Sequence, residues 1–328
     1  MKPIRWGIIA TGSIAHKLAS DIALVPDAEL TAVGSRQLET AETFAAQYGA
    51  RRSYGSYADV AADPDVDVVY VATPHALHRE NVELCLAGGK AVLCEKALAL
   101  NGNDAEAMAT TARAAGLFLM EAMWMRCNPN IRALQTLVDG GAVGEVRQID
   151  ANFGFVADKP PEHRLFDPAL GASALLDIGI YPLTFAWLLL GAPTHISSSG
   201  QLSERGIDLV CESVLSYDDG RVARIACSMI EELSCTATIE ASSGRIEFAP
   251  RFQEAREFTV TTDAGRSTYS DNIRGRGYVH EIEEVHRCLR EGRTESSLVP
   301  LDETVALMRL MDTIRAQIGS TLPGDDVV

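Results

Sequence analysis

The sequence predicts an α/β protein of two domains, and three observations support this. Up to about residue 122, short apolar runs typical of buried strands alternate with helical patterns, which indicates a parallel sheet with right-handed crossovers. Beyond that point, strand-like segments are separated by hairpin signals such as Asp218-Asp-Gly220, which indicates an antiparallel sheet. The length of 328 residues is sufficient for two cores. We therefore expect domains at residues 1–122 and 123–328.

In the first domain, each expected strand is an apolar run and each expected helix has apolar residues at helical spacing. The expected strands are 4–10, 29–33, 66–71, 91–95 and 117–120, and the expected helices are 14–22, 38–48, 77–87 and 103–115, with a short αβ piece at 54–62.

The second domain is expected to be an α+β domain with a large, mainly antiparallel sheet. It should begin with a helix at 129–139 and a strand at 146–155, followed by a strongly apolar helix that ends at Leu190. The expected later elements are strands near 195–202, 208–217, 222–228, 234–241, 245–248 and 257–262, and helices at 278–290 and 301–318.

Composition restricts the class of partner and the location. The formal net charge is −16, which argues against a nucleic-acid partner, because such partners bind basic surfaces. No apolar run has the length of a membrane span, and Lys2-Pro-Ile-Arg5 does not resemble a secretory signal, so we expect a cytoplasmic protein without a membrane partner. The seven cysteines form no Cys-x-x-Cys pair, which argues against disulfides and against a thiolate zinc site.

The turn after the first strand reads Ala10-Thr11-Gly12-Ser13-Ile14-Ala15, a variant of the Gly-x-Gly-x-x-Gly/Ala dinucleotide fingerprint. Gly12 would let the backbone approach a pyrophosphate, and the helix N-terminus would supply N–H groups and a positive dipole. This predicts a Rossmann dinucleotide-binding domain. Because Ala10 replaces the first glycine, a plain strand–helix corner is the alternative.

The second strand ends in Gly34-Ser35-Arg36, without the acidic residue that binds the ribose hydroxyls in sites that prefer NAD. Ser35 and Arg36 could instead bind a 2′-phosphate by charge-assisted hydrogen bonds. We therefore expect NADP as the cofactor, with NAD as the second possibility. A solvated arginine at a helix start is the alternative interpretation of Arg36.

Two further strands end in polar residues. Thr73-Pro74-His75, with His78 three residues later, follows the third strand, and Glu95-Lys96 ends the fourth. Carboxyl ends of parallel strands are where open α/β sheets bind ligands, and a partly desolvated lysine there is suited to proton chemistry. The alternative is a lysine that only terminates a strand. The two histidines lack a third ligand, so no metal is expected, and His78 would instead stabilise the loop or line the cofactor site.

These motifs resemble the glucose–fructose oxidoreductase / inositol dehydrogenase (Gfo/Idh/MocA) family along essentially the whole chain. The resemblance rests on Gly7 to Ala15, on Ala72-Thr-Pro-His75 with His78, on Cys94-Glu95-Lys96 and on Asp177-Ile-Gly-Ile-Tyr181. Ala97 stands where the family usually has proline. Tyr181 together with Glu121-Ala-Met-Trp-Met-Arg126 is similar to the branch of dihydrodiol and D-xylose dehydrogenases.

The resemblance implies an NAD(P)-dependent dehydrogenase that acts on a sugar, polyol or cyclic diol. Lys96 and Tyr181 would flank the reacting carbon, with Tyr181 exchanging the alcohol proton and Lys96 lowering the pKa of Tyr181 from its usual value near 10. Asp177, four residues before Tyr181, would orient substrate hydroxyls or Lys96. Trp124 would lie near the nicotinamide and the substrate, and Arg126 would bind a substrate oxygen or pair with an acid. The expected cofactor contacts are Ala10, Thr11, Gly12, Ser13, Ile14, Ser35, Arg36, Thr73, Pro74, His75, His78, Glu95, Lys96 and Trp124.

Two other functions are compatible with the sequence. One is a non-enzymatic NADP sensor or regulator, because the family fold also occurs in a transcriptional repressor of sugar metabolism. The other is an NAD-assisted glycosidase that uses its cofactor transiently. For each, the partner is a small molecule, and a homodimer or homotetramer formed through the second domain's sheet is expected.

Overall fold

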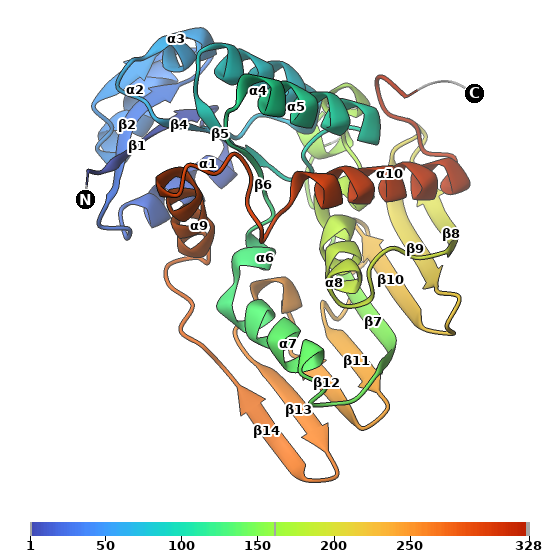
Figure 1. The fold of residues 1–328 in the computed structure, drawn as a ribbon. Coiled ribbons are helices and arrows are strands. Elements are labelled where there is room, and N and C mark those ends of the chain that lie inside the picture. Colours follow the sequence, from blue (N-terminus) through green and yellow to red (C-terminus); the bar gives the residue numbers. More distant parts are fainter. Residues whose placement is uncertain (1, 161, 326–328) are drawn as a thin grey trace. The chain divides into compact units, whose positions relative to one another are not determined.

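The computed structural model describes residues 2–160 and 162–325, which form two compact units (Figure 1). Unit 1 combines the first 127 residues with residues 274–308, and unit 2 consists of residues 128–273 and the segment that begins at residue 309. This differs from the expected division into 1–122 and 123–328, because the segment 274–308 returns to the dinucleotide-binding unit.

The sheet of unit 1 contains six strands in the order β3-β2-β1-β4-β5-β6, and each pair is parallel. The all-parallel sheet confirms the α/β prediction and places the carboxyl ends of the strands at one edge. The strands are β1 (Ile4–Ile9), β2 (Ala28–Gly34), β3 (Arg52–Tyr54), β4 (Val68–Val71), β5 (Ala91–Glu95) and β6 (Leu119–Ala122).

Helices cover both faces of this sheet (Figure 1). Adjacent residues of β1 show the two faces, because a Cβ on Gly7 would lie 2.8 Å from Val60 of α3, whereas the Trp6 indole N–H donates to His286 of α9 at 2.9 Å. The helices of unit 1 are α1 (Ser13–Ile22), α2 (Leu38–Tyr48), α3 (Tyr57–Ala62), α4 (His78–Ala87), α5 (Gly102–Ala115), α6 (Trp124–Cys127) and α9 (Val279–Arg290), with a 3₁₀ turn, η1, at His75–Leu77.

The start of α9 is anchored to α1 by a buried carboxylate. Asp21 accepts hydrogen bonds from the backbone N–H groups of Arg276, Tyr278 and Val279 at 2.9–3.3 Å. The donors of Tyr278 and Val279 are among those that a helix N-terminus leaves without an intrahelical partner. Asp21 therefore fastens a segment more than 250 residues away in the sequence to the first helix.

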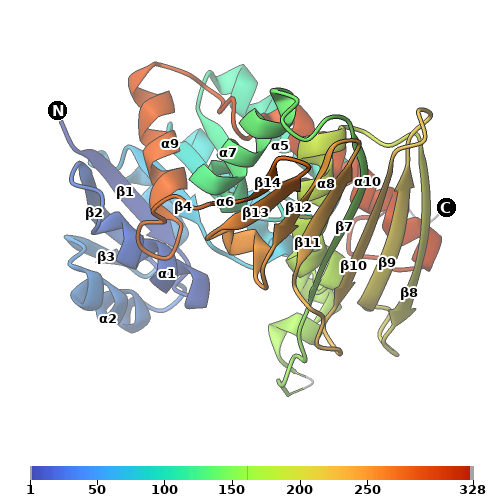
Figure 2. The same ribbon diagram turned by 90° about the horizontal axis from the view of Figure 1, so that it is seen from below.

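The sheet of unit 2 has eight strands in the order β14-β13-β12-β11-β7-β10-β9-β8, which lie side by side in Figure 2. All pairs are antiparallel except β7 with β10, which are parallel, so the predicted mainly antiparallel sheet is confirmed. The strands are β7 (Val146–Gly154), β8 (His195–Leu202), β9 (Asp208–Ser216), β10 (Val222–Ser228), β11 (Ala237–Ala241), β12 (Gly244–Phe248), β13 (Phe258–Thr262) and β14 (Gly265–Tyr269).

One face of this sheet packs against the apolar helix that the sequence predicts. The helix consists of a π-helical segment, η4 (Leu175–Gly179), followed by α8 (Ile180–Leu190). Residues 168–190 are long and apolar enough to cross a bilayer, with a mean hydropathy of 1.6, whereas we expected no apolar run of that length. However, 78% of the apolar 18-residue window within them is buried, as in the core helix of a globular domain. The other helical elements of unit 2 are α7 (Pro129–Asp139) and the short turns η2 (Arg164–Phe166), η3 (Pro168–Leu170) and η5 (Phe252–Glu254), and α10 (Leu301–Ile318) belongs to both units.

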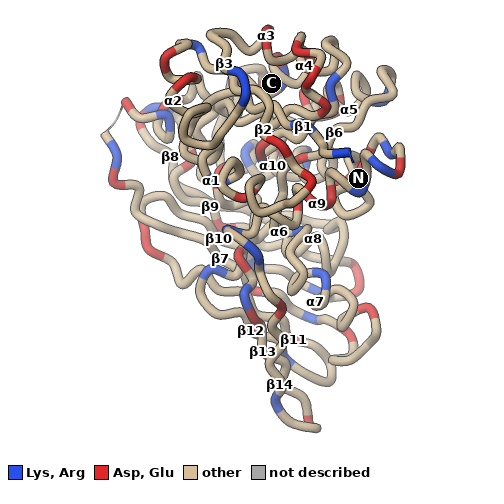
Figure 3. Tube along the Cα trace, turned by 90° about the vertical axis from the view of Figure 1, so that its left-hand side faces the viewer, with Lys and Arg blue, Asp and Glu red and all other residues tan. Residues whose placement is uncertain are grey.

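The side chains on the other face of this sheet are largely polar. Arg224 of β10 pairs with Asp150 of β7 at 3.6 Å, and Arg245 of β12 pairs with Glu240 and Glu247. Figure 3 shows such basic and acidic positions interspersed along these strands. The homo-oligomer expected through this sheet stays a prediction.

The turn between β1 and α1 has an unusual backbone at Ala10, the residue in the first glycine position of the fingerprint. Ala10 has a φ of 70°, in the left-handed region that costs an L-residue about 1–2 kcal/mol. Its backbone N–H is nevertheless bound to the carbonyl of Gly34 at 3.0 Å. The position thus has the geometry of the fingerprint but lacks the residue that adopts it without strain.

Ala10→Gly should therefore raise the free energy of unfolding by roughly 0.5–1 kcal/mol, because relief of the strained φ outweighs the extra chain entropy of glycine. Urea denaturation measures the change. The matched control is Ala107→Gly, in the interior of α5, which should lower the free energy of unfolding by about 1 kcal/mol. Equal losses in the two variants would contradict the role assigned to the Ala10 backbone.

Candidate active site

The predicted dinucleotide loop lies at the carboxyl end of β1. Gly12 directly precedes α1, no side chain caps that helix, and a Cβ on Gly12 would meet no atom within 4 Å. The helix N-terminus is therefore open to an anionic group, and Ser13 beside it is exposed. This geometry fits the pyrophosphate of a dinucleotide, held by the loop from Ala10 to Ile14.

The end of β2 presents the second predicted feature. Ser35 is buried and its N–H donates to the Tyr54 carbonyl at 3.1 Å, whereas the Arg36 side chain is exposed. The charge of Arg36 acts on the Tyr57 hydroxyl, whose pKa is raised by burial and lowered in part by this arginine. Residues 34–38 contain no acid that could bind the ribose hydroxyls, and the expected preference for NADP stays a prediction.

Lys96 directly follows β5, and its peptide groups are held by side chains from η1 and α4. A ring nitrogen of His75 lies 3.2 Å from the Lys96 carbonyl oxygen, and Nδ1 of His78 lies 3.0 Å from that of Ala97. The other nitrogen of His78 lies 2.9 Å from the carbonyl oxygen of Thr73. The Lys96–Ala97 peptide bond is cis, at the position where the family usually has proline. The turn that follows β5 is thus fixed to the turn that follows β4.

These contacts distinguish the two roles considered for His78, which were to stabilise the loop or to line the cofactor site. The ring is fully buried and both of its nitrogens face backbone carbonyl groups, which agrees with the first role. Burial lowers the pKa of His78 to about 3, so the ring is neutral at pH 7 and donates from one nitrogen. His78 therefore supports the lysine turn, and its predicted contact with a cofactor stays untested.

Glu95, next to Lys96, is surrounded by buried side chains that the sequence did not indicate. The Tyr70 hydroxyl donates to its carboxylate, and burial raises the pKa of Tyr70 well above its usual value, so the phenol keeps its proton. Glu281 of α9 is fully buried near Glu95, and burial followed by the charges of Glu95 and Asp21 raises its pKa well above the ordinary range. Burial thus favours the neutral form of Glu281. The contact of Glu95 with a cofactor stays a prediction.

A second buried carboxyl group, Glu121 of β6, also contacts the lysine turn. Its Oε1 accepts the N–H of Leu98 at 3.0 Å, and its Oε2 accepts the hydroxyl of Thr304 at 3.1 Å. Burial raises its pKa from the ordinary 4.5 to about 7, which the two hydrogen bonds and the charges of Arg126 and Lys96 oppose. The sequence offered no signal for this contact, because Thr304 is 183 residues away.

Trp124 and Arg126 both lie in α6 and are buried. The Trp124 ring lies beside that of Tyr278, with 5.2 Å between the ring centroids. Arg126 donates to Glu303 at 2.6 Å. Of the two roles considered for Arg126, the structure shows the pairing with an acid, and the contacts of Trp124 with cofactor and substrate remain predictions.

Unit 2 carries the other two predicted catalytic residues, on the helix that packs against its sheet. Asp177 is half-buried in the π-helical segment, and Tyr181 lies in the first turn of α8. The segment replaces the α-helix we expected here, and π-helical turns are frequent at functional sites. The Tyr181 ring packs against Phe153 of β7, with centroids 5.7 Å apart.

The position of this helix depends on Asp208, which sequence reasoning did not identify. One oxygen of Asp208 accepts the Ser173 hydroxyl at 3.0 Å and the Leu175 N–H at 2.8 Å, and the other accepts the Ser320 hydroxyl at 3.0 Å. Gly179 allows the helix to approach β10, because a Cβ there would lie 2.8 Å from the sulfur of Cys227.

The structure thus places the predicted site residues in two groups. Unit 1 holds the residues of the dinucleotide loop, the ends of β2, β4 and β5, and α6. Unit 2 holds Asp177 and Tyr181 on one helix. The pairing of Lys96 with Tyr181 is therefore taken up as a proposal below.

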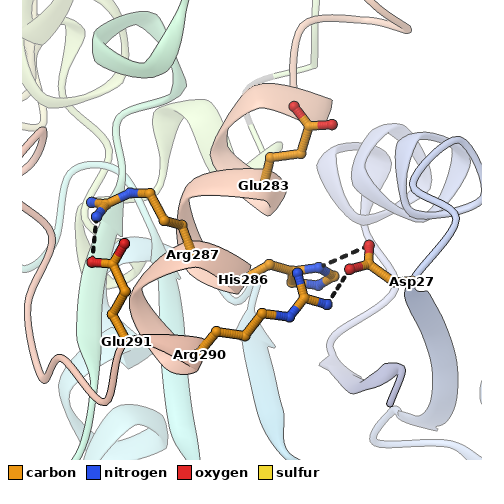
Figure 4. Close-up of a pocket in the computed structure, with 6 residues that line it drawn as sticks. All are labelled: Asp27, Glu283, His286, Arg287, Arg290 and Glu291. Atoms are coloured by element: carbon orange, nitrogen blue, oxygen red, sulfur yellow. Dashed lines mark hydrogen bonds and ion pairs between the residues drawn. The ribbon is translucent and has the colours of Figure 1, made fainter. Parts of the chain in front are cut away.

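A polar cavity of about 400 Å³ in unit 1 does not belong to this site (Figure 4). Asp27 precedes β2 and thus lies at the amino edge of the parallel sheet, opposite the loops described above. It pairs with Arg290 and lies 3.4 Å from Nδ1 of His286, whose Nε2 accepts the Trp6 N–H. These contacts fasten α9 to the sheet. The lining residues are Asp27, Glu283, His286, Arg287, Arg290 and Glu291.

Comparison with known protein families agrees with both sheets. Residues 4–123 match the model described as an oxidoreductase family with an NAD-binding Rossmann fold, and residues 131–247 match that of the GFO/IDH/MocA C-terminal domain. The chain belongs to the Gfo/Idh/MocA family. The resemblance seen in the sequence motifs is thereby confirmed, and this member is an oxidoreductase that uses a nicotinamide cofactor.

Relatives within the family cover nearly the full length of the chain. It is 35% identical to the trans-1,2-dihydrobenzene-1,2-diol dehydrogenases of Mus musculus and Homo sapiens, over 98% of this chain and 99% of each relative. A 3-ketoreductase from Actinomadura kijaniata, solved with NADP and TDP-benzene, has a TM-score of 0.87 and 26% identity and covers 97% of this chain and 98% of that one. Levoglucosan dehydrogenase, solved with NADH and levoglucosan, shares the fold, with a TM-score of 0.88 at 18% identity and 97% of each chain covered.

The ionisation of Glu121 should be visible in the pH dependence of stability. Between pH 4.5 and 7 the folded protein keeps a proton on Glu121 that the unfolded chain releases, so this group lowers stability as the pH rises through that window. Glu121→Gln cannot titrate and should remove that fall, which amounts to up to about 3 kcal/mol.

Urea denaturation of both proteins at pH 5 and pH 7.5 tests this. The free energy of unfolding of Glu121→Gln, relative to the wild type, should be higher at pH 7.5 than at pH 5. The same difference at both pH values would show that Glu121 has an ordinary pKa.

Proposed function

We propose that this protein is an NADP-preferring dehydrogenase that oxidises a secondary alcohol of a cyclic diol, sugar or polyol. The observation that carries the proposal is the position of Lys96, fixed by its peptide groups at the carboxyl edge of the dinucleotide-binding sheet. The nearly full-length likeness to dihydrodiol dehydrogenases supports a vicinal diol as the first substrate class to test.

In this proposal the residues of unit 1 bind and orient. Gly12 and the uncapped N-terminus of α1 hold the pyrophosphate, and Arg36 binds the 2′-phosphate. Bound NADP supplies the carbon that accepts the hydride. Trp124 limits water at the reacting centre, because its ring is buried and lies beside that of Tyr278.

Proton transfer is assigned to Tyr181. Its phenol exchanges the proton of the substrate hydroxyl, and the Lys96 ammonium favours the phenolate by its positive charge. Asp177, which precedes Tyr181 on the same helix, orients a second hydroxyl of the substrate. In support, solved structures of the Actinomadura ketoreductase include variants with a tyrosine replaced by phenylalanine and a lysine replaced by alanine.

Lys96→Met and Tyr181→Phe should each lower kcat at least about 100-fold, because each removes a group that acts on the transferred proton. The measurement is the absorbance of reduced nicotinamide, with a panel of trans-dihydrodiols, aldoses and polyols. Binding of NADP, followed by fluorescence, should remain within about threefold of the wild type. Full activity of either variant would exclude the role given to that residue, and binding without turnover across the panel would favour a sensor.

Arg36→Ala should weaken binding of NADP about 10- to 100-fold and leave NAD nearly unchanged, because only NADP carries the phosphate that the guanidinium binds. Isothermal titration of both cofactors measures the two effects. Equal losses for NADP and NAD would contradict the predicted cofactor preference.

A further inference from the structure

Glu121 lies directly behind the turn that carries Lys96. It comes from β6, the strand paired with β5, where it stands opposite Cys94. Its side chain is buried and both of its oxygens are used, one by the Leu98 N–H and one by the Thr304 hydroxyl. Because Leu98 is two residues beyond Lys96, the first of these bonds fixes the backbone from which the lysine side chain extends.

The charged groups around Glu121 are few. Lys96 and Arg126 are the cations whose positive charges favour its carboxylate, and Arg126 is itself paired with Glu303 at 2.6 Å. The thiol of Cys94 is neutral, because burial and the charges of Glu95 and Glu121 raise its pKa well above the usual value. With a pKa of about 7, Glu121 changes its charge near neutral pH.

We propose that Glu121 is a positioning residue of the reaction, which holds the lysine turn through the Leu98 N–H and holds it more firmly as a carboxylate than as an acid. A hydrogen bond to a carboxylate is shorter and about twice as strong as one to a neutral acceptor. The inference rests on the proposed function, which gives Lys96 its role. Glu121 itself touches neither substrate nor cofactor in this proposal.

Glu121→Gln keeps the shape of the side chain and removes its negative charge, so the variant tests the effect of the charge alone. The glutamine amide oxygen can still accept the Leu98 N–H, and its amino group can donate to Thr304, so the variant resembles the protonated acid at every pH. The ratio of wild-type kcat to variant kcat should therefore be near one at pH 5.5 and rise to about tenfold at pH 8.5, with a midpoint near 7. The assay uses the best substrate of the panel with saturating NADP, and affinity for NADP should change less than about twofold.

Two further variants test the assignment. Thr304→Val removes one hydrogen-bond donor to the Glu121 carboxylate and should therefore raise the pKa of Glu121. The ratio of kcat of Thr304→Val to kcat of Glu121→Gln should then have its midpoint at a higher pH than the wild-type ratio has. Glu284→Gln is the matched control, because Glu284 is a buried carboxylate of α9 that accepts the Arg287 guanidinium at 2.8 Å and the Ser296 hydroxyl. It should lower the melting temperature and leave its kcat ratio to wild type constant with pH. A constant ratio for Glu121→Gln would overturn the inference.

Lys96→Met separates failure of this inference from failure of the proposed function. If Lys96→Met retains turnover, the proposed function is wrong about the lysine, and Glu121 has nothing to position. If Lys96→Met abolishes turnover and the ratio for Glu121→Gln is constant with pH, the proposed function stands and only the positioning role is overturned.

Discussion

The peptide groups from Lys96 to Leu98 are the constraint on which the site in unit 1 depends. His75 and His78 contact two successive carbonyl groups of this turn, and Glu121 accepts the N–H of Leu98. Irregular backbone inside a protein must find partners for its polar groups, and here those partners come from the loops that follow β4 and from the adjacent strand β6. A lysine held in this way has a fixed backbone and a side chain that remains half-exposed.

In unit 2, too, a buried side chain binds polar groups at the start of the segment that carries the predicted site residues. The start of the helix that carries Asp177 and Tyr181 is bound by Asp208 of β9, which accepts N–H and hydroxyl groups that the helix start would otherwise leave unpaired. Burial raises the pKa of Asp208, and hydrogen bonds from Leu175, Ser173 and Ser320 offset part of that effect. In each unit, a buried carboxyl group thus fixes the segment that carries the residues to which we assign the reaction.

Much of this was accessible from the sequence, because it depends on local patterns. The alternation of strands and helices, the Ala10–Ala15 turn and Lys96 at a strand end each follow from periodicity or from a short motif, and the structure has them at the expected places. The π-helical turn before Tyr181 was missed, since its sequence is as apolar as an ordinary helix. The partners Glu121–Thr304, Asp21–α9 and Asp208–Ser320 were also missed, because their residues are 112 to 258 positions apart and no local pattern links them.

The discontinuity of unit 1 has a consequence for how the protein is made. The face of the sheet that contains Trp6 is completed by α9, whose first residues are fixed by Asp21 and whose His286 accepts the indole N–H. A nascent chain presents Trp6 at the beginning of translation, but its partner emerges only after some 280 more residues. Until then the part of this apolar sheet face that α9 covers is exposed during synthesis. The dinucleotide-binding unit, first in the sequence, must therefore complete its core after most of unit 2 has left the ribosome, and we expect chaperones to meet this chain at that stage.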